Sequence, residues 1–157
     1  MIEVHVYTDG SHLDKQHGGR LGCGGVVVIN GKAVNTFSCE LDAPYMQMMF
    51  GSSKCSNPSA EFVAIYLALT TFNKELKGAD QIVFYSDFVG IKDWMSGRWK
   101  AKETIIKNIK SVIDAELKKQ GLTDKVDFQW VKGHQKSSNT HAYWNNYADK
   151  LAKGEKK

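Results

Sequence analysis

The sequence predicts an α/β fold, with a five-stranded mixed sheet of three antiparallel strands followed by two parallel strands and flanking helices. The N-terminal part alternates apolar and polar residues around Asn30-Gly31, a strong hairpin turn. Farther along, short apolar runs alternate with segments of helical periodicity. The length of 157 residues suits one domain, which we place at residues 1–153, with a short basic tail at residues 154–157.

The first part of the chain is expected to form three strands and a long loop. Ile2, Val4 and Val6 alternate with polar or mixed residues, as in a half-buried strand. A glycine-rich stretch then leads into the second strand, and Asn30-Gly31 turns the chain into the third. The strands are expected at residues 2–8, 26–29 and 33–40, and the loop, which contains a methionine-rich run, at residues 41–56.

The remainder is expected to alternate helices and strands. Ser56-Asn57-Pro58 offers a cap and then a proline at the first helical position. Phe62, Ile65, Leu69 and Phe72 follow at helical spacing, which predicts a helix with one buried face. The later elements are a buried strand at 82–85, helices at 89–95 and 101–119, a strand at 126–131, a polar loop at 132–140 and a helix at 142–153.

The composition is that of a soluble globular protein, with 42% hydrophobic and 24% charged residues. No apolar run approaches the roughly 20 residues of a membrane span, and the N-terminus does not resemble a signal peptide. Cys23, Cys39 and Cys55 form no CxxC pair, so we expect free thiols in a reduced, cytoplasmic compartment. A metal site of these cysteines with His12 or His17 is an alternative, but the spacing matches no compact zinc pattern.

The net charge of +4 is a mild indication of a polyanionic partner. The segment from Lys92 to Lys110 holds six basic and two acidic residues, and it includes Trp94 and Trp99. Basic residues interleaved with aromatic residues suit contact with a nucleic-acid backbone. A solvated amphipathic helix with two core tryptophans explains the same pattern, and charge alone favours this second explanation.

Four carboxylates are candidates for a common site: two at the ends of predicted strands, one in the first turn of a predicted helix and one in the last helix. Asp9 ends the first strand and Asp87 follows the fourth. Glu61 lies in the first turn of the first long helix, and Asp149 lies in the final helix. Because residues just past strand carboxyl ends gather at one crevice of an α/β sheet, these carboxylates can meet.

Clustered carboxylates predict a metal site, because a hard divalent cation such as Mg²⁺ or Mn²⁺ removes their mutual repulsion. Two such ions about 3.5–4 Å apart can hold the attacking and leaving oxygens of a phosphodiester during in-line displacement. This two-metal chemistry requires several carboxylates but no cysteine nucleophile and no serine triad. The four carboxylates therefore point to metal-dependent phosphoryl chemistry.

Each carboxylate also has a structural explanation, which is the better one when the residue is taken singly. Asp9-Gly10 is a common turn pair, and Glu61 suits the dipole of a helix N-terminus. Asp87 can cap the following helix, and Asp149 can pair with Lys153 at i+4. The functional interpretation becomes persuasive only when the surrounding motifs fit.

Five sequence blocks together resemble the type 1 ribonuclease H family. They occur in the family's order, between the expected elements, and cover nearly the whole chain. The blocks are Tyr7-Thr8-Asp9-Gly10-Ser11, Ala60-Glu61, Tyr85-Ser86-Asp87, Trp130-Val131-Lys132-Gly133-His134 and Asn145-x-x-Ala148-Asp149-x-Leu151-Ala152. The resemblance implies a ribonuclease H-like fold and an endonuclease that hydrolyses the RNA strand of RNA–DNA hybrids with two Mg²⁺ ions, Mn²⁺ being possible.

The resemblance also implies roles for individual residues. His134, otherwise an ordinary exposed loop histidine, would assist proton transfer or product release. Trp99 and Lys100 would contact the DNA strand, and the chain would act as a monomer away from membranes. The implied metal-binding catalytic carboxylates are Asp9, Glu61, Asp87 and Asp149, and the further substrate contacts are Ser11, Ser56, Asn57 and Asn145.

The chain departs from the family pattern in several places. Many members carry an Asn-Asn-Arg-type run before the helix glutamate, whereas this chain has Ser56-Asn57-Pro58-Ser59. Phe88-Val89 replaces a common Ser-Gln pair, the basic protrusion after Trp94 is shortened, and the loop at 41–56 is longer than usual. These departures bear on substrate affinity and preference more than on the catalytic chemistry.

Two other functions stay open on the sequence alone. One is a DNA nuclease of the resolvase or integrase type on the same fold, against which the blocks at 130–134 and 145–151 argue. The other is a catalytically silent nucleic-acid-binding module. Retention of all four acids argues against that module, because it would gain nothing from carboxylates that repel one another.

Overall fold

The computed structural model describes residues 1–13, 19–53, 56–97, 104–133 and 139–154. In this part of the chain it contains one five-stranded sheet with the order β3-β2-β1-β4-β5. The strands are β1 (Glu3–Leu13), β2 (Arg20–Ile29), β3 (Lys32–Leu41), β4 (Gln81–Ser86) and β5 (Val126–Trp130). The helices are α1 (Ala43–Phe50), α2 (Asn57–Thr71), α3 (Asn73–Lys77), α4 (Gly90–Met95), α5 (Thr104–Gln120) and α6 (Thr140–Ala152).

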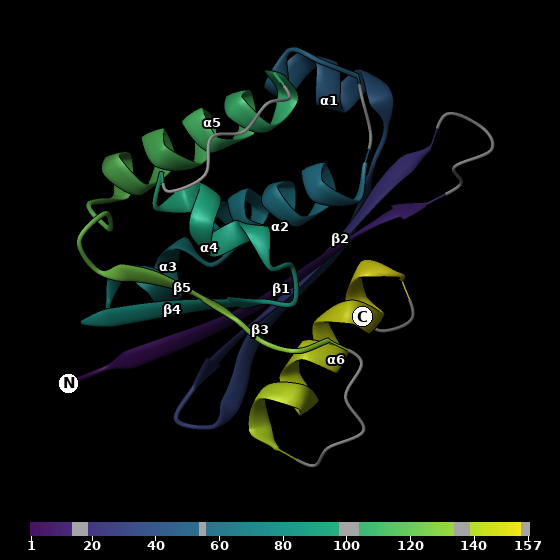
Figure 1. Ribbon diagram of the computed structural model, residues 1–157. Helices are drawn as coiled ribbons and strands as arrows, with labels where there is room; N and C mark the ends of the chain where they lie inside the picture. Colours follow the sequence, from purple (N-terminus) through teal and green to yellow (C-terminus); the bar gives the residue numbers. More distant parts are fainter. Residues whose placement is uncertain (14–18, 54–55, 98–103, 134–138, 155–157) are drawn as a thin grey trace.

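The sheet is mixed, as the sequence predicted. β1, β2 and β3 form an antiparallel meander, and β4 and β5 add parallel strands on the other side of β1. Helices α2 and α5 lie over one face of the sheet, and α6 lies over the opposite face (Figure 1). The fold therefore consists of three layers with the sheet in the middle.

The first two strands are longer than predicted. β1 was expected to end at Thr8, but its antiparallel pairing with β2 continues to Leu13, which lies opposite Arg20. The glycine-rich stretch at residues 18–25 was interpreted as punctuation before β2, whereas its part from Arg20 onward lies within this strand. The reason is the packing of α6: a Cβ at Gly24 would lie 2.4 Å from the backbone nitrogen of Ala152. Glycine lets the helix backbone approach the strand closely.

The loop predicted at residues 41–56 contains helix α1, so this prediction was wrong. The helix forms because the Asp42 carboxylate caps it, accepting a hydrogen bond from the backbone N–H of Tyr45 at 3.0 Å. Gly51, in the left-handed conformation with φ of 72°, ends it. Met46 and Phe50 are buried, so part of the methionine-rich run belongs to the core.

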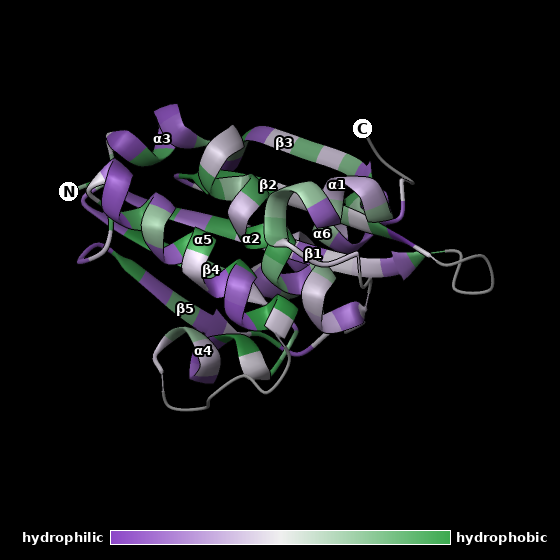
Figure 2. Ribbon diagram, turned by 90° about the horizontal axis from the view of Figure 1, so that it is seen from above, coloured by the Kyte–Doolittle hydropathy of each residue, from purple (hydrophilic) through white to green (hydrophobic). Residues whose placement is uncertain are grey.

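The main core lies between the sheet and the layer of α2 and α5. Figure 2 shows mainly hydrophobic residues on α2 and a mixture of hydrophilic and hydrophobic residues along α5. The second pattern is that of an amphipathic helix with one face in the core. Helix α2 begins as predicted from its cap, since the Ser56 hydroxyl accepts the backbone N–H of Ser59 at 3.2 Å. Pro58 is the second helical residue rather than the first.

The basic segment from 92 to 110 is only partly described. Trp94, in α4, stacks on Phe62 of α2 with ring centroids 5.1 Å apart, so this tryptophan packs against the core. Trp99 and Lys100 lie outside the described residues. No helix in the described ranges is long and apolar enough to cross a membrane.

The contact of α2 with β1 depends on the absence of a side chain at Gly10. A Cβ at this position would lie 2.3 Å from both the carbonyl carbon and the oxygen of Ala60. Gly10→Ala should lower the free energy of unfolding by about 3 kcal/mol, at the upper end of overpacking costs, because backbone must move. Urea denaturation monitored by circular dichroism measures this change.

Gly78→Ala is the matched control. A Cβ at Gly78 would meet nothing within 4 Å, and φ there is −86°, which suits alanine. We expect a change within about 0.5 kcal/mol. Equal losses in the two variants would show that the tight α2–β1 contact is not what Gly10 provides.

Candidate active site

Two of the predicted acids come from neighbouring parallel strands. Tyr7 is the last residue of β1 that pairs with β4, and Asp9 follows two positions later on the same face. Asp87 comes directly after Ser86, the last residue of β4. Asp9 was predicted to end the first strand. It lies within β1 instead, because the pairing of β1 with β2 continues beyond it to Leu13. The parallel pairing with β4 nevertheless ends at Tyr7, so the two aspartates meet at the same edge.

Glu61 reaches this edge from α2. It is the fifth residue of the helix rather than part of its first turn, because the capping of α2 starts at Ser56. One carboxylate oxygen accepts the backbone N–H of Gly10 at 3.0 Å, and the other accepts the Ser86 hydroxyl at 3.0 Å. Both oxygens of Glu61 are therefore held in place by β1 and by the end of β4.

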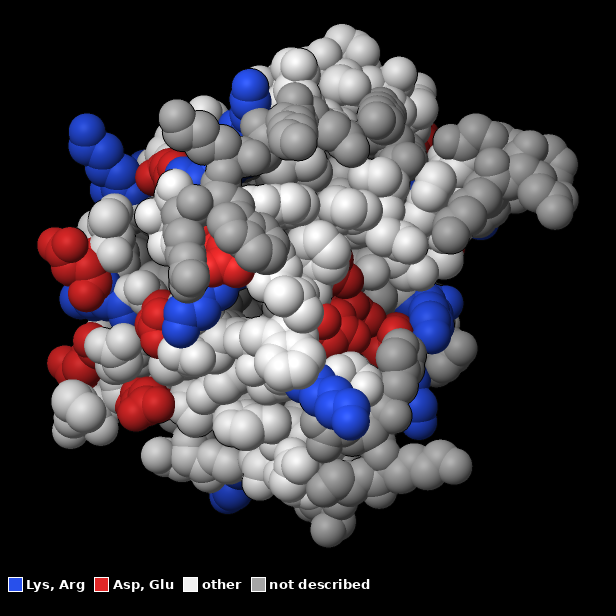
Figure 3. Space-filling model, in the orientation of Figure 1, with Lys and Arg blue, Asp and Glu red and all other residues white. Residues whose placement is uncertain are grey.

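The carboxylate oxygens of Asp9, Glu61 and Asp87 lie within 4.8 Å of one another. Asp9 and Glu61 are buried, at 4% and 5% exposure, whereas Asp87 is half-buried. Figure 3 shows acidic side chains gathered in a patch on the face of the molecule where α6 also lies. This acidic cluster of Asp9, Glu61 and Asp87 is the candidate metal site.

Asp149 approaches the acidic cluster from α6. Its carboxyl group shares a hydrogen bond with that of Asp9. Its Oδ2 atom also accepts from Lys153 Nζ at 3.1 Å. The i+4 ion pair considered from the sequence is thus present, and it coexists with the contact to Asp9.

Burial and mutual repulsion keep protons in the acidic cluster when no cation is bound. Burial raises the pKa of Asp9 far above its usual range, and the negative charge of Glu61 raises it further. Burial also raises the pKa of Glu61, although the hydrogen bond from Asp9 opposes this shift. A divalent cation would supply the missing positive charge, and oxygen donors alone suit Mg²⁺ or Mn²⁺. The donor set therefore fits such an ion.

The alternative metal site at the cysteines is not formed in the described part of the chain. Cys23 and Cys39 lie opposite each other on β2 and β3 and are free thiols. The acidic cluster is the one group of potential ligands that converges within the described residues. Cys55 and His17 lie outside them.

Several predicted substrate contacts lie around the acidic cluster. Ser56 and Asn57 begin α2, where the Ser56 hydroxyl is used in capping and Asn57 Oδ1 accepts the backbone N–H of His12 at 2.9 Å. Ser11 follows Gly10 in β1 and is half-buried. Asn145 is buried in α6, and its Oδ1 atom has no hydrogen-bond partner among the described residues.

His134, Trp99 and Lys100 lie outside the described residues, but the approach to His134 is defined. A Cβ at Gly133 would lie 2.7 Å from Asp87 Oδ2, so the backbone just before His134 passes against the acidic cluster. The indole N–H of Trp130 donates to the Asp87 carbonyl at 3.1 Å and ties β5 to the same point.

Ser86 has a role in the site that the sequence motifs did not predict. Its hydroxyl donates to Glu61 and accepts the backbone N–H of Phe88 at 3.1 Å. The available signal was a small hydroxyl residue between an apolar strand and an aspartate. Such a residue at a strand end can hold a neighbouring carboxylate.

The fold and the clustered acids define a hydrolase that acts with metal ions. The family described as RNase H matches residues 2–157. Ribonuclease H of Shewanella baltica strain OS155 is 31% identical over 141 residues, which cover 83% of this chain and 77% of that protein. The chain belongs to the ribonuclease H family and is a ribonuclease.

Solved structures of the same fold agree. RNase H1 from the halophilic archaeon Halobacterium salinarum NRC-1 superposes with a TM-score of 0.72 at 20% identity, covering 98% of this chain and 96% of that one. LC11-RNase H1 in complex with an RNA/DNA hybrid gives a TM-score of 0.71 at 20% identity, covering 94% and 92%. At these identities the likeness concerns the fold.

The raised pKa of Asp9 makes the metal-free protein less stable as the pH rises. The folded state keeps a proton that the unfolded carboxyl releases near pH 4, so this stabilising contribution is complete below about pH 4 and is lost progressively as the pH rises from there toward the raised pKa of the folded state. Asp9→Asn does not titrate, so in chelator at pH 7.5 it should exceed the wild type in unfolding free energy by at least about 1 kcal/mol.

Thermal unfolding with EDTA from pH 4 to pH 8 measures this difference, which should widen with pH. Saturating Mg²⁺ should narrow or reverse it, because the cation stabilises the wild-type cluster. Asp114→Asn is the control, since Asp114 is an exposed acid of α5 paired with Lys110. A constant difference across the pH range would contradict the proposed protonation of Asp9.

Proposed function

We propose that this ribonuclease is an endonuclease that hydrolyses the RNA strand of RNA–DNA hybrids with divalent metal ions, Mg²⁺ being the physiological one. The observation that carries the proposal is the acidic cluster of buried Asp9 and Glu61 with half-buried Asp87, in a chain that matches the family over residues 2–157. The RNA/DNA hybrid bound by LC11-RNase H1 supports the substrate class.

The metal ligands in this proposal are Asp9, Glu61, Asp87 and Asp149. Divalent ions bound there would neutralise the developing charge on the scissile phosphate and lower the pKa of an attacking water. Gly10 and Ser86 fix the orientation of Glu61, so this ligand needs little reorganisation when a cation arrives. Asp149 is more exposed than Asp9 and Glu61, with 18% of its side chain accessible, so its side chain can change position as substrate enters.

The remaining residues bind and orient the nucleic acid. Asn57 and Ser56 at the start of α2 suit contact with both strands at the minor groove, where 2′-hydroxyl groups distinguish RNA from DNA. Ser11 and Asn145 would complete these contacts beside the acids. Trp99 and Lys100 would hold the DNA strand through stacking and phosphate contact, which positions the duplex without reading its sequence.

The chain is also proposed to act as a monomer in the cytoplasm. Free Cys23 and Cys39 suit a reducing compartment. Size-exclusion chromatography with light scattering tests the oligomeric state.

Asp9→Asn and Asp87→Asn should each reduce cleavage of a labelled RNA–DNA hybrid by at least about 10³-fold, because each removes an anionic metal ligand. Hybrid affinity should stay within a few-fold, since other residues provide phosphate contacts. The assay runs hybrid, double-stranded RNA and double-stranded DNA, each with Mg²⁺ and with chelator.

Asp114→Asn serves as the control and should cleave like the wild type. Appreciable turnover in both acid variants would sink the assignment of the site. Cleavage of double-stranded DNA in preference to the hybrid would instead support a DNA nuclease on this fold. Hybrid binding without any cleavage would support the silent binding module.

His134 is proposed to hold or deliver a proton near the leaving oxygen. Its neighbour Gly133 lies against Asp87, which supports this place for it. A positioned acid or base contributes about 10²–10⁴-fold, and water can partly replace a loop histidine, so His134→Ala should lower kcat by about 10²-fold or less. KM for the hybrid and the dependence on Mg²⁺ should persist.

Steady-state kinetics at two Mg²⁺ concentrations measure these parameters, with His17→Ala as the matched histidine control. If His134→Ala were as inactive as Asp9→Asn, or recovered with more Mg²⁺, His134 would be a ligand or structural residue.

A further inference from the structure

A cluster of three rings lies between α6 and the sheet, beside the acidic cluster. Tyr7 of β1 and Tyr85 of β4 stack with centroids 4.7 Å apart at 15°. The ring of His141, in the first turn of α6, lies 4.5 Å from that of Tyr85. We call Tyr7, Tyr85 and His141 the aromatic clasp.

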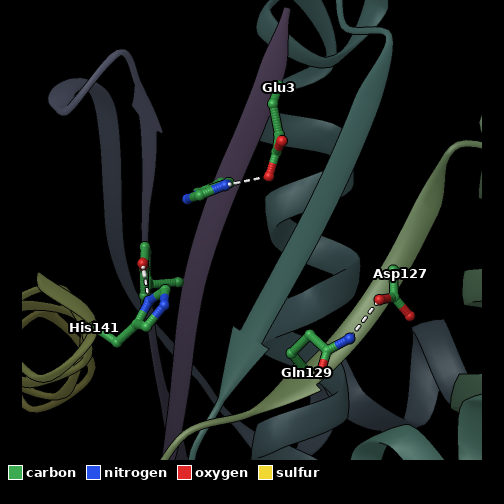
Figure 4. Close-up of polar contacts among 6 residues, drawn as sticks. Glu3, Asp127, Gln129 and His141 are labelled. Atoms are coloured by element: carbon green, nitrogen blue, oxygen red, sulfur yellow. Dashed lines mark hydrogen bonds and ion pairs between the residues drawn. The ribbon is translucent and has the colours of Figure 1, made fainter.

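A hydrogen bond closes the aromatic clasp. The hydroxyl of Tyr7 lies 2.6 Å from Nδ1 of His141, and Figure 4 shows this bond where α6 begins beside β1. A phenol hydroxyl is a good donor and an imidazole nitrogen a good acceptor, so we assign Tyr7 as the donor. Tyr7 is fully buried whereas His141 is exposed, so the bond is partly shielded from solvent.

Each ring of the clasp lies on or next to an element that positions a proposed metal ligand. Tyr7 precedes Asp9 by two residues on β1, so this ring and carboxylate share a face of the strand. Tyr85 lies on β4, and Asp87 follows the end of this strand two residues later. On α6, His141, Asn145 and Asp149 follow at intervals of four and form one row along the helix. At one end of this row His141 contacts Tyr7, and at the other end Asp149 contacts Asp9.

Helix α6 is tied to the sheet near both of its ends. At the C-terminal end, Ser38 donates to the Leu151 carbonyl, and Gly24 allows close backbone contact. At the N-terminal end, a hydrogen bond ties His141 to Tyr7 of β1. Asp149 lies between these ties, so the rotation and tilt that they set determine where its carboxylate points.

We propose that Tyr7 and His141 are positioning residues, whose hydrogen bond orients α6 so that Asp149 joins the acidic cluster. This inference rests on the proposed metal site. It assigns to the clasp an effect on cation affinity rather than on the chemical step, because neither residue is itself placed as a ligand.

Tyr7→Phe and His141→Ala should each weaken Mg²⁺ binding about 3- to 10-fold, measured by isothermal titration calorimetry on the full chain without nucleic acid. The two effects should not add in the double variant, because both substitutions remove the same bond. His141→Asn should recover most of the affinity, since its Oδ1 atom offers an acceptor close to the position of Nδ1. With saturating Mg²⁺, kcat and KM for the hybrid should stay within about twofold of the wild type.

Two controls separate positioning from loss of stability. Tyr143→Phe removes a hydroxyl from an exposed tyrosine of the same helix and should leave Mg²⁺ affinity unchanged. Ile113→Val lowers stability through the core beneath α5, by about 0.5–1.5 kcal/mol, and should also leave it unchanged. Weaker Mg²⁺ binding in Ile113→Val at a similar loss of Tm would overturn the positioning role.

Asp9→Asn distinguishes this inference from the proposal beneath it. If Asp9→Asn binds Mg²⁺ like the wild type, the metal site is misassigned and the clasp inference falls with it. If Asp9→Asn loses Mg²⁺ binding while Tyr7→Phe and His141→Ala keep full affinity, only the clasp inference is overturned. Because His141 lies at the surface, His141→Ala keeps the test valid even if Tyr7→Phe fails to fold.

Discussion

The close packing of α2 on β1 at Gly10 is the contact on which the candidate site depends. It brings a helix backbone so near the strand that Glu61 accepts a hydrogen bond from the Gly10 N–H. Without it, Glu61 would not reach the edge where β1 and β4 present Asp9 and Asp87. The same contact aligns α2 with the main core, so the packing that stabilises the fold also assembles the acids.

The acidic cluster sets stability against function. Burial makes Asp9 and Glu61 costly to ionise, and their hydrogen bonds to each other hold a proton between them. Ordinary folding would favour an apolar or amide residue at such a position. The cost is consistent with a site whose proper partner is a cation, and the hydrogen bonds from Gly10 and Ser86 keep Glu61 ready for that cation.

Most of the sheet and the meeting of Asp9 with Asp87 could be predicted, because strand periodicity and the shared edge of parallel strands are local rules. Helix α1 could not be found from periodicity, since its apolar run is short, although Asp42 before Ala43-Pro44 was an available capping signal. The length of β2 could not be predicted, because glycine disfavours strands. The glycines in β2 are explained by the close approach of α6, which is a tertiary contact. The role of His141 belongs to no motif and depends on tertiary contact.

The bond between Tyr7 and His141 joins residues 134 positions apart. Closing so long a loop has a large entropic cost, and nonlocal contacts of this kind slow folding. The neighbouring strands β1 and β2 can pair much earlier, because a short connection joins them. We therefore expect α6 to dock late in folding, so that a partly folded chain would hold three carboxylates without the fourth. On this order of events, catalytic competence would arise with the last long-range contact rather than with the first compact structure.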